Sequence, residues 1–214
     1  MDKFKVLNFG TYLAGPLTAK YLQQMGYKII TIKPPKDHKQ YIEEQKWGKD
    51  IVKELCRDQK VLHINLKKEF SEIVDYIKTC DIIIENFRPN VMKSLGLDYE
   101  FCKSINPNVV YVSLPGFASV DDEFKNLKAY EAIILAVSGI FKDMGLNRQL
   151  MGISSSYSDL PLASVYGSVF ACFAVISKLI LVHRSTKIVD TKIEIPLASA
   201  VSEALVHNSL DFSC

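Results

Sequence analysis

Short runs of β-branched and apolar residues alternate with helical patterns through the first half of the chain, and this alternation constrains the fold more than any other feature. The runs expected to form strands are residues 5–9, 28–33, 61–66, 81–85 and 109–114. Between the third and fourth runs, apolar residues recur at the spacing of a helix face: Phe70, Ile73, Val74 and Ile77. Strands that alternate with helices are typical of a parallel sheet covered by helices. The predicted fold class is therefore α/β.

Further elements are expected between and beyond these strands. The first helix begins near Pro16, which suits an initial helical turn, and ends at Gly26. The charge-rich stretch 36–60 is expected to wrap the surface as a helix between loops, and it carries no recognisable functional motif. After the fifth strand, the pattern predicts a helix at 128–139, a strand at 192–195 and a helix from residue 197 onwards.

The apolar run from Leu162 to Val182 is long enough to cross a bilayer, so two interpretations compete for it. It carries Lys178 near one end, together with four small or hydroxyl-bearing residues: Ser164, Gly167, Ser168 and Ser177. No other segment and no flanking charge pattern supports insertion into a membrane. The prediction is therefore a buried helix in the core of the domain.

Composition argues against several classes of partner. The 214 residues are 48% hydrophobic and can bury a sizeable core, while the formal net charge is only +2. Such a weak overall charge gives little reason to expect nucleic acid or a membrane as a partner. The cysteines are scattered without metal-ligand spacing, so free thiols and no metal are expected. The N-terminus resembles neither a signal peptide nor a transit peptide, and the expected location is the cytoplasm.

The loop from Gly10 to Gly15 joins the first strand to the first helix and invites comparison with dinucleotide-binding sites. That fingerprint contains three glycines, and only two are present here. It also places an acidic residue near the end of the second strand to bind the ribose hydroxyls, where this chain has Lys33. NAD is therefore disfavoured, and a tight turn without a ligand is a second interpretation of the loop.

Several phrases of the sequence resemble CoA-transferase family III, which includes formyl-CoA transferase, carnitine-CoA transferases and α-methylacyl-CoA racemases. Residues 6–35 match the family's strand, AGP turn, helix, glycine and final diproline. The phrase ENFRP at 85–89 lies at the family's spacing from the phrase SLPGF at 113–117. Shorter matches extend the resemblance over nearly the whole chain: Leu95–Tyr99, Asn106–Pro107, Lys128–Glu131 and Val137–Gly139.

The resemblance implies a Rossmann-like large domain over residues 1–195, with flanking helices, and a helix over 196–214 that leads toward a small domain. In the family, two such chains interlock as rings. Because the small domain should begin about where this chain stops, we expect a fold that is incomplete relative to the family. A truncated chain, one product of a split gene and a degenerate copy are the alternatives. The expected partner is a second copy in a homodimer or a polypeptide that supplies the C-terminal half.

The resemblance also implies that the chain binds coenzyme A as the carrier of an acyl group. The phosphates of CoA need positive side chains and backbone donors around a groove that holds the pantetheine arm. Positions that match the family's CoA-contacting segments are Tyr12, Leu13, Ile64, Asn65, Leu66, Lys67, Asn86, Phe87, Arg88, Lys128, Tyr130 and Glu131. Lys67, Arg88 and Lys128 are the charged members, and the alternative for each is an ordinary solvated cation. Lys33 departs from the pattern, because the family usually has an acidic residue before its diproline.

Members of the family use an aspartate carboxylate as a nucleophile, and counting from the Lys128–Glu131 phrase places it at Asp159. Attack on an acyl-CoA thioester gives a mixed anhydride, which free CoA thiolate and then an acceptor acid reopen. Counted back from the strand at 192–195, the aspartate would fall within 162–166, where no acidic residue exists. Asp159 also has an ordinary alternative role, because an aspartate shortly before Pro161 is a good N-terminal cap for a helix.

Three functions stay open at this point. The first is an acyl-CoA:carboxylate CoA-transferase that acts on an acyl-CoA and a carboxylic acid and is active only with its C-terminal half. The second is a non-catalytic remnant that binds CoA or a partner. The third is an acyl-CoA racemase or a related isomerase; the racemases of the family move a proton with a histidine and an aspartate. The resemblance puts Tyr130 at the place of that histidine and so favours a transferase. Glu131 is expected near the site, either to position substrate or to hydrogen-bond a neighbouring loop.

Overall fold

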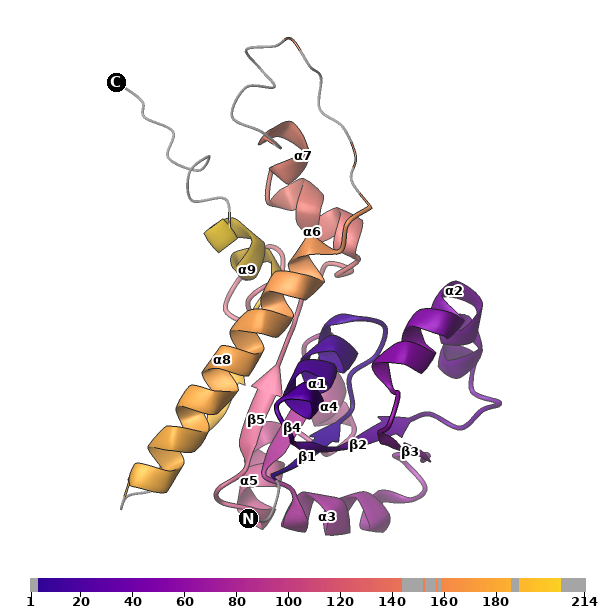
Figure 1. Ribbon diagram of the computed structural model, residues 1–214, viewed down its shortest axis with the longest axis vertical. Helices are drawn as coiled ribbons and strands as arrows, with labels where there is room; N and C mark the ends of the chain where they lie inside the picture. The colour runs from indigo at the N-terminus through magenta and orange to yellow at the C-terminus, as the bar shows by residue number, and fades with distance from the viewer. Residues whose placement is uncertain (1–3, 144–151, 153–156, 158, 186–188, 205–214) are drawn as a thin grey trace.

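The computed structural model describes residues 4–143, 152, 157, 159–185 and 189–204. These residues contain one sheet of six parallel strands in the order β3-β2-β1-β4-β5-β6 (Figure 1). The strands are β1 (Lys5–Asn8), β2 (Lys28–Lys33), β3 (Lys60–His63), β4 (Ile82–Glu85), β5 (Val110–Ser113) and β6 (Lys192–Glu194). The order runs outward in both directions from the β1–β4 pair, which is the arrangement of a Rossmann fold. The predicted α/β class and its Rossmann-like parallel sheet are confirmed.

Helices cover both faces of this sheet (Figure 1). They are α1 (Ala14–Gln24), α2 (Lys39–Leu55), α3 (Phe70–Thr79), α4 (Val91–Ser94), α5 (Tyr99–Ile105), α6 (Glu131–Val137), α7 (Ile140–Asp143), α8 (Leu162–Arg184) and α9 (Leu197–Ala204). The helix expected within 36–60 is α2, and it is bent at Gly48, where φ is −158° and ψ is 33°. The sequence pattern does not predict α4, α5 or α7, because each has only one or two turns in which periodicity can show.

The strand expected at 61–66 ends early, at His63, because a turn begins at Asn65. Asn65 Oδ1 accepts hydrogen bonds from the backbone N–H of Lys67 at 3.1 Å and of Lys68 at 3.3 Å. Asparagine forms such turns readily, because its short side chain can bond the backbone two or three residues ahead. The turn places the polar residues that follow β3 at the carboxyl edge of the sheet.

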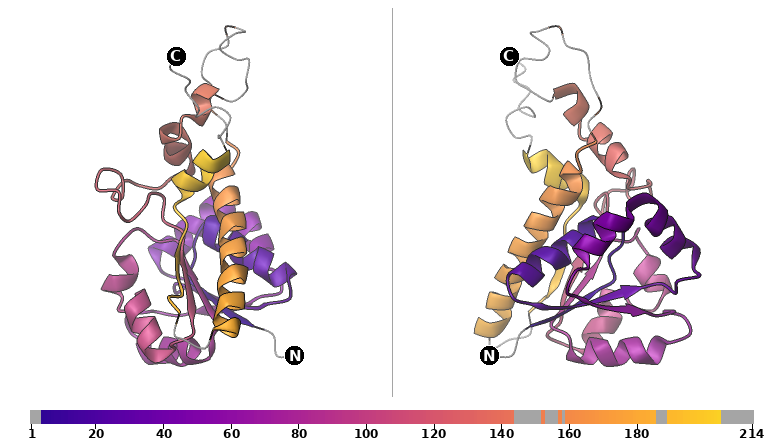
Figure 2. Two further views of the ribbon diagram at one scale, coloured as in Figure 1. Left: turned by 90° about the vertical axis from the view of Figure 1, so that its left-hand side faces the viewer. Right: turned by 45° about the vertical axis from the view of Figure 1, so that its right-hand side comes forward.

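The sheet is apolar on both faces, because successive residues of a strand point to opposite sides. In β4, Ile82 and Ile84 pack in the layer that contains α1, α6 and α8, whereas Ile83 packs in the layer that contains α3 and α5. All three side chains are fully buried. The left view of Figure 2 shows α5 and α8 on opposite sides of the sheet. Burial on both faces explains why the strands read as nearly continuous apolar runs in the sequence.

Helix α8 is buried on one face only, so the prediction of a buried core helix is confirmed for its inner face and wrong for its outer face. The inner face lies against α1 and α9, and a Cβ atom added at Gly167 would come within 2.3 Å of the Leu197 side chain. The outer face carries large apolar side chains that are exposed, including Val169 at 51%, Phe173 at 72% and Ile180 at 47%. By length and composition, α8 is also the one helix among the described residues that is able to cross a membrane. The core helix of a soluble protein passes the same test, so this property does not assign α8 to a membrane.

Candidate functional site

The loop between β1 and α1 is held in place by side chains from other segments. The N–H of Gly10 donates to Asn8 Oδ1 at 2.8 Å. Thr11 is held at both of its backbone groups: its N–H donates to Asn86 Oδ1 at 2.8 Å, and its carbonyl accepts from Asn86 Nδ2 at 3.0 Å. Asn86 follows β4, so this predicted site residue contacts the loop backbone and fixes it to the neighbouring strand. The loop is therefore ordered by the protein's own hydrogen bonds.

A fourth bond holds the next residue of the loop. The N–H of Tyr12 donates to Glu44 Oε1 of α2 at 3.1 Å. The same carboxylate accepts from Lys33 Nζ, at 2.7 Å to Oε1 and 2.8 Å to Oε2, and both side chains of this ion pair are only 3% exposed. Tyr12 has a φ of 58°, which is unfavourable for a residue with a side chain by about 1–2 kcal/mol. Glu44 thus stabilises the strained backbone of Tyr12, whose side chain projects into solvent.

The two glycines of the loop have a structural explanation. A Cβ atom added at Gly10 would lie 2.6 Å from the Cα of Gly15, and one added at Gly15 would lie 2.6 Å from the Cα of Gly10. Both residues are therefore required by the close approach of the loop to the start of α1. Lys33, at the end of β2, carries an ammonium group that only donates, and this group is paired with Glu44. Its side chain therefore cannot accept hydrogen bonds from ribose hydroxyls. These observations support the sequence argument against NAD.

A cavity of about 410 Å³ opens at the carboxyl ends of β1, β2 and β3. It brings together predicted site residues from two segments: Ile64, Asn65, Leu66, Lys67 and Phe87. Its walls are mostly apolar, and its far side is formed by the segment that leads into α2. Lys33 also lines it, but the ammonium group is bonded to Glu44. Lys67 is the exposed lysine at this cavity.

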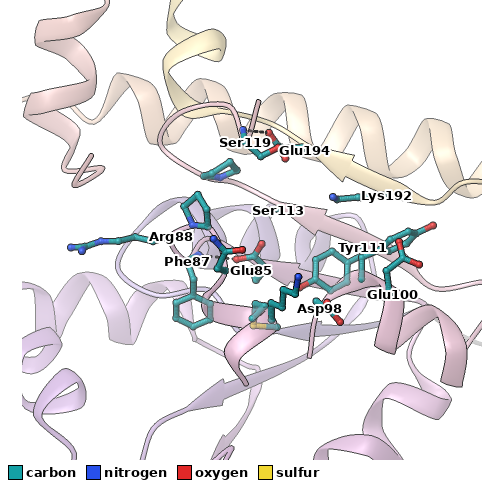
Figure 3. A pocket seen from close by; sticks show the side chains of 16 residues that line it. Glu85, Phe87, Arg88, Asp98, Glu100, Tyr111, Ser113, Ser119, Lys192 and Glu194 are labelled. Atoms are coloured by element: carbon teal, nitrogen blue, oxygen red, sulfur yellow. Dashed lines mark hydrogen bonds between the residues drawn. The ribbon is translucent and has the colours of Figure 1, made fainter. Parts of the chain in front are cut away.

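A second hollow, of about 240 Å³, lies at the carboxyl ends of β4, β5 and β6 (Figure 3). Arg88 lines this hollow, so the structure does not place it in one cavity with Lys67. In Figure 3 the Arg88 side chain extends away from Glu85 and Tyr111. Burial raises the pKa of Glu85 to about 7, although hydrogen bonds from the Ser113 hydroxyl and the Phe87 N–H partly oppose the shift.

The predicted residues at the start of α6 form a separate group. The helix begins at Glu131 and not at residue 128, because the Tyr130 N–H bonds to the Lys128 carbonyl in a tighter turn. Lys128 and Tyr130 are exposed. Partial burial, the carboxylates of α2 and the Tyr130 hydroxyl all raise the pKa of Tyr12, in that order of size. The two tyrosines are thus close enough to interact electrostatically, and they connect this group to the first loop.

Glu131 binds the N-terminus of α8. Its carboxylate accepts from the Ala163 N–H at 2.6 Å, from the Ser164 hydroxyl at 2.6 Å and from the Ser164 N–H at 3.3 Å. The first N–H groups of a helix have no partner within the helix, and a carboxylate satisfies them well. Of the two roles expected for Glu131, the hydrogen bond to a neighbouring segment is the one observed.

Asp159 lies two residues before Pro161, the residue at the N-cap position of α8. The cap position has no side-chain hydrogen bond, so the capping role expected for Asp159 is wrong and Glu131 fills it. The Asp159 side chain is exposed and forms no hydrogen bond or ion pair with the residues that the structure describes. Its carboxylate oxygens are therefore accessible to a reagent.

The cysteines offer no competing nucleophile within the described residues. Cys56, Cys80, Cys102 and Cys172 are free thiols, as predicted, and Cys214 lies outside the described residues. Burial raises the pKa of the Cys80, Cys102 and Cys172 thiols to about 12, so each is protonated at neutral pH. In the same part of the chain, no group of three or more histidine, cysteine, aspartate or glutamate residues is arranged to hold a metal ion.

Comparison with known proteins identifies the family. The sequence model of CoA-transferase family III matches residues 1–210. The chain belongs to CoA-transferase family III. A relative from Marinomonas sp. (strain MWYL1), the CoA-transferase/lyase DddD, is 38% identical over 207 residues, which are 96% of this chain and 24% of that protein. The acetyl-CoA:oxalate CoA-transferase of Acetobacter aceti is 28% identical over 194 residues, which are 87% of this chain and 48% of that protein.

Two solved structures share the fold. A CaiB/BaiF family protein from Brucella suis superimposes with a TM-score of 0.82 at 23% identity and covers 96% of this chain and 55% of its own. Rv3272 from Mycobacterium tuberculosis gives a TM-score of 0.82 at 19% identity, with 97% and 57% covered. This family III chain thus spans about half the length of these structures and a quarter to a half of the curated relatives named above.

Glu44 is the residue of this site that sequence reasoning missed. It lies in the charge-rich stretch 36–60, which has no motif, and its partner Lys33 is on β2. The one available signal was Lys33 itself, because a lysine that replaces the family's usual acidic residue at a buried strand end calls for a compensating carboxylate.

Proposed function

We propose that this chain is the CoA-binding domain of an acyl-CoA:carboxylate CoA-transferase and that Asp159 is its nucleophile. The observation that carries the proposal is the division of roles before α8: Glu131 binds the helix N-terminus, and Asp159 is left exposed with no described partner. A carboxylate nucleophile must have an oxygen lone pair free for attack. The competing structural role of Asp159 has been taken over by another residue.

The cavity beside β1, β2 and β3 supports CoA as the carrier. Its mostly apolar walls suit the pantetheine arm and the adenine ring, and Lys67 supplies a positive charge for a phosphate group. Ligands of open parallel sheets bind outside the carboxyl ends of the strands, which is where this cavity lies. The residues that follow β3 were matched to CoA contacts by the family resemblance, and they line the same cavity.

The reaction needs only anionic nucleophiles. The Asp159 carboxylate attacks the thioester carbonyl of the acyl-CoA, the C–S bond breaks, and CoA leaves as a thiolate. The thiolate then attacks the aspartyl carbonyl of the mixed anhydride, which releases the donor acid and forms an aspartyl-CoA thioester. The acceptor carboxylate attacks that thioester and displaces the thiolate, and the thiolate opens the second anhydride at the acceptor carbonyl. The products are a new acyl-CoA and the original Asp159 carboxylate.

This sequence of steps transfers no proton, so it needs no histidine. The exposed Tyr130 stands where a racemase of the family would have its histidine, and its phenol is a weak base at neutral pH. The proposal therefore favours transfer over racemisation.

Chemical trapping tests the assignment. The chain is combined with the polypeptide that completes the family fold, incubated with an acyl-CoA and quenched with hydroxylamine, and the peptides are analysed by mass spectrometry. A hydroxamate at Asp159 is the expected product. Acyl transfer with a hydroxamate at another residue would exclude Asp159 as the nucleophile. Absence of both transfer and trapping would favour the non-catalytic, CoA-binding alternative.

We also propose that the outer face of α8 is a contact surface for the rest of the assembly, either a second copy or a polypeptide that carries the C-terminal half of the fold. Two observations support this: the chain spans about half the length of the solved family structures, and the outer face of α8 is apolar and exposed. In Figure 1, α8 lies along one side of the described fold. Exposed apolar patches of this kind mark interaction sites.

Phe173→Glu tests this contact, because Phe173 is 72% exposed and its loss should not disturb the core. Size-exclusion chromatography should show assembly by the wild type and its loss in the variant. Assembly by the variant as strong as that of the wild type would remove α8 from the interface.

A further inference from the structure

Glu44 holds two parts of the CoA-binding region at once. On one side its Oε1 accepts from the Tyr12 N–H, and on the other both of its oxygens accept from Lys33 Nζ. Gln40 lies one helical turn before Glu44 on α2, on the same face of the helix, and it lines the cavity together with Thr11 and Lys33. The carboxylate therefore connects the β1–α1 loop, the end of β2 and the first turns of α2, all of which border the cavity.

We infer that Glu44 is a positioning residue for CoA binding: its carboxylate fixes the backbone of Tyr12 and the first turns of α2, and thereby shapes the wall of the cavity. The inference rests on the proposed function and extends it to a residue that does not touch the ligand. Glu44 is almost fully buried, at 3% exposure, so it acts through the groups it binds.

Backbone strain explains why the loop needs such an acceptor. Tyr12 has its φ in the left-handed region, at 58°, and it is one of three non-glycine residues in the described part of the chain with positive φ. Left-handed backbone is unfavourable for a residue with a Cβ, so the turn persists only if bonds to neighbouring groups hold it. Glu44 supplies the bond to the strained residue itself, whereas Asn8 and Asn86 hold the two residues before it.

The ion pair alone does not account for Glu44. Burying a lysine and a glutamate costs solvation energy, and replacement of such a pair by two apolar residues is often neutral for stability. Among the residues that the structure describes, Lys33 Nζ bonds only to the Glu44 carboxylate, whereas Glu44 has the additional backbone donor of Tyr12. The pair is thus asymmetric: Lys33 neutralises the carboxylate, and the carboxylate holds the loop.

Two double variants separate the loop contact from the ion pair. Lys33→Met with Glu44→Met removes both charges and the acceptor for the Tyr12 N–H. Lys33→Met with Glu44→Gln also removes both charges but keeps a side-chain carbonyl that accepts from the same N–H. Three quantities are measured for the wild type and both variants: the thermal midpoint, the Kd for coenzyme A by calorimetry, and the hydrogen-exchange rate of the Tyr12 amide by NMR.

The Met–Met variant should bind coenzyme A about tenfold more weakly than the Met–Gln variant and exchange its Tyr12 amide about tenfold faster, which is the effect of one hydrogen bond to a strained backbone. Both variants should be folded, and the difference in Kd should not follow the thermal midpoint. Equal Kd values and equal exchange rates in the two variants would overturn the inference. If wild type does not bind coenzyme A, the proposed function fails, and the Tyr12 exchange rate alone decides whether Glu44 holds the loop.

Discussion

The β1–α1 loop and the segment that leads into α8 use their polar groups in opposite ways. In the loop, three successive backbone N–H groups, of residues 10, 11 and 12, each donate to a side chain. In the segment before α8, Asp159 is exposed and bonds to none of the described residues. Under the proposed function, this difference corresponds to two tasks. A binding loop gains affinity when its conformation is fixed in advance, whereas a nucleophile needs free lone pairs.

The largest effect should come from removing the free carboxylate. Asp159→Asn in the completed assembly should lower the rate of acyl transfer by roughly 10⁴-fold or more, because an amide cannot form the anhydride. The variant should keep its stability and its Kd for CoA, since Asp159 holds no described group. Transfer rates, thermal midpoints and CoA titrations of both proteins check the expectation. A variant with full transfer activity would show that Asp159 is not the nucleophile and would make it a structural residue.

The buried carboxyl group of Glu85, at the end of β4, should instead make stability depend on pH. Burial raises the pKa of Glu85 to about 7 from 4.5, so the folded state keeps its proton over a pH range in which the unfolded state has lost it. The contribution of Glu85 to stability should therefore be greatest below pH 4.5, fall as the pH rises to about 7 and then level off. The total loss is about 3 kcal/mol.

Urea unfolding of wild type and Glu85→Gln between about pH 4.5 and pH 8 measures this effect. As the pH rises over that range, the wild type should lose unfolding free energy relative to the variant, because the glutamine amide does not titrate. A constant difference would show that the carboxyl group is ionised in the fold, and the hollow of Figure 3 would then contain a buried charge.

Glu131, unlike Asp159, is a carboxylate whose oxygens are bonded to the protein, so its removal should reduce stability. Glu131→Ala leaves the Ala163 N–H and both donors of Ser164 without their acceptor, and should lower the unfolding free energy by about 1–2 kcal/mol. Glu131→Gln is the matched control, since its carbonyl oxygen can still accept and should restore most of the stability. If Asp159→Ala destabilised the protein more than Glu131→Ala, the assignment of the cap to Glu131 would be wrong.

Local sequence patterns predicted the strands of this fold. The strands were placed to within a few residues, because parallel strands buried on both faces leave continuous apolar runs. Turn chemistry explains the main error, since the Asn65 turn ended β3 early. The outer face of α8 was assigned wrongly because the helix is apolar all round, so its sequence does not reveal which side is covered.

The site was less accessible to sequence reasoning, because its contacts join distant segments. Family resemblance found the residues after β3 that line the cavity, but it could not reveal that Arg88 lines a different hollow. The bond from Glu131 to Ala163 spans 32 residues and removes the capping role from Asp159. The bond from Tyr12 to Glu44 also spans 32 residues, and it arises in a segment with no motif. Such pairs depend on how the elements pack, which no local pattern encodes.

The smallest expected effect concerns the one exposed lysine at the cavity. Lys67→Ala should weaken CoA binding by about two- to fivefold, because an exposed cation contributes only modestly to a screened contact with phosphate. The same substitution should reduce the salt dependence of the Kd. Lys68→Ala is the matched control: Lys68 is adjacent, equally charged and exposed, but it does not line the cavity, so its loss should change both quantities less. Calorimetric titrations of the three proteins at low and high salt measure both effects. Equal effects of the two substitutions would mean that the phosphates respond to the general charge of this surface, and the loop, held by its own hydrogen bonds, would then be the main determinant of the CoA site.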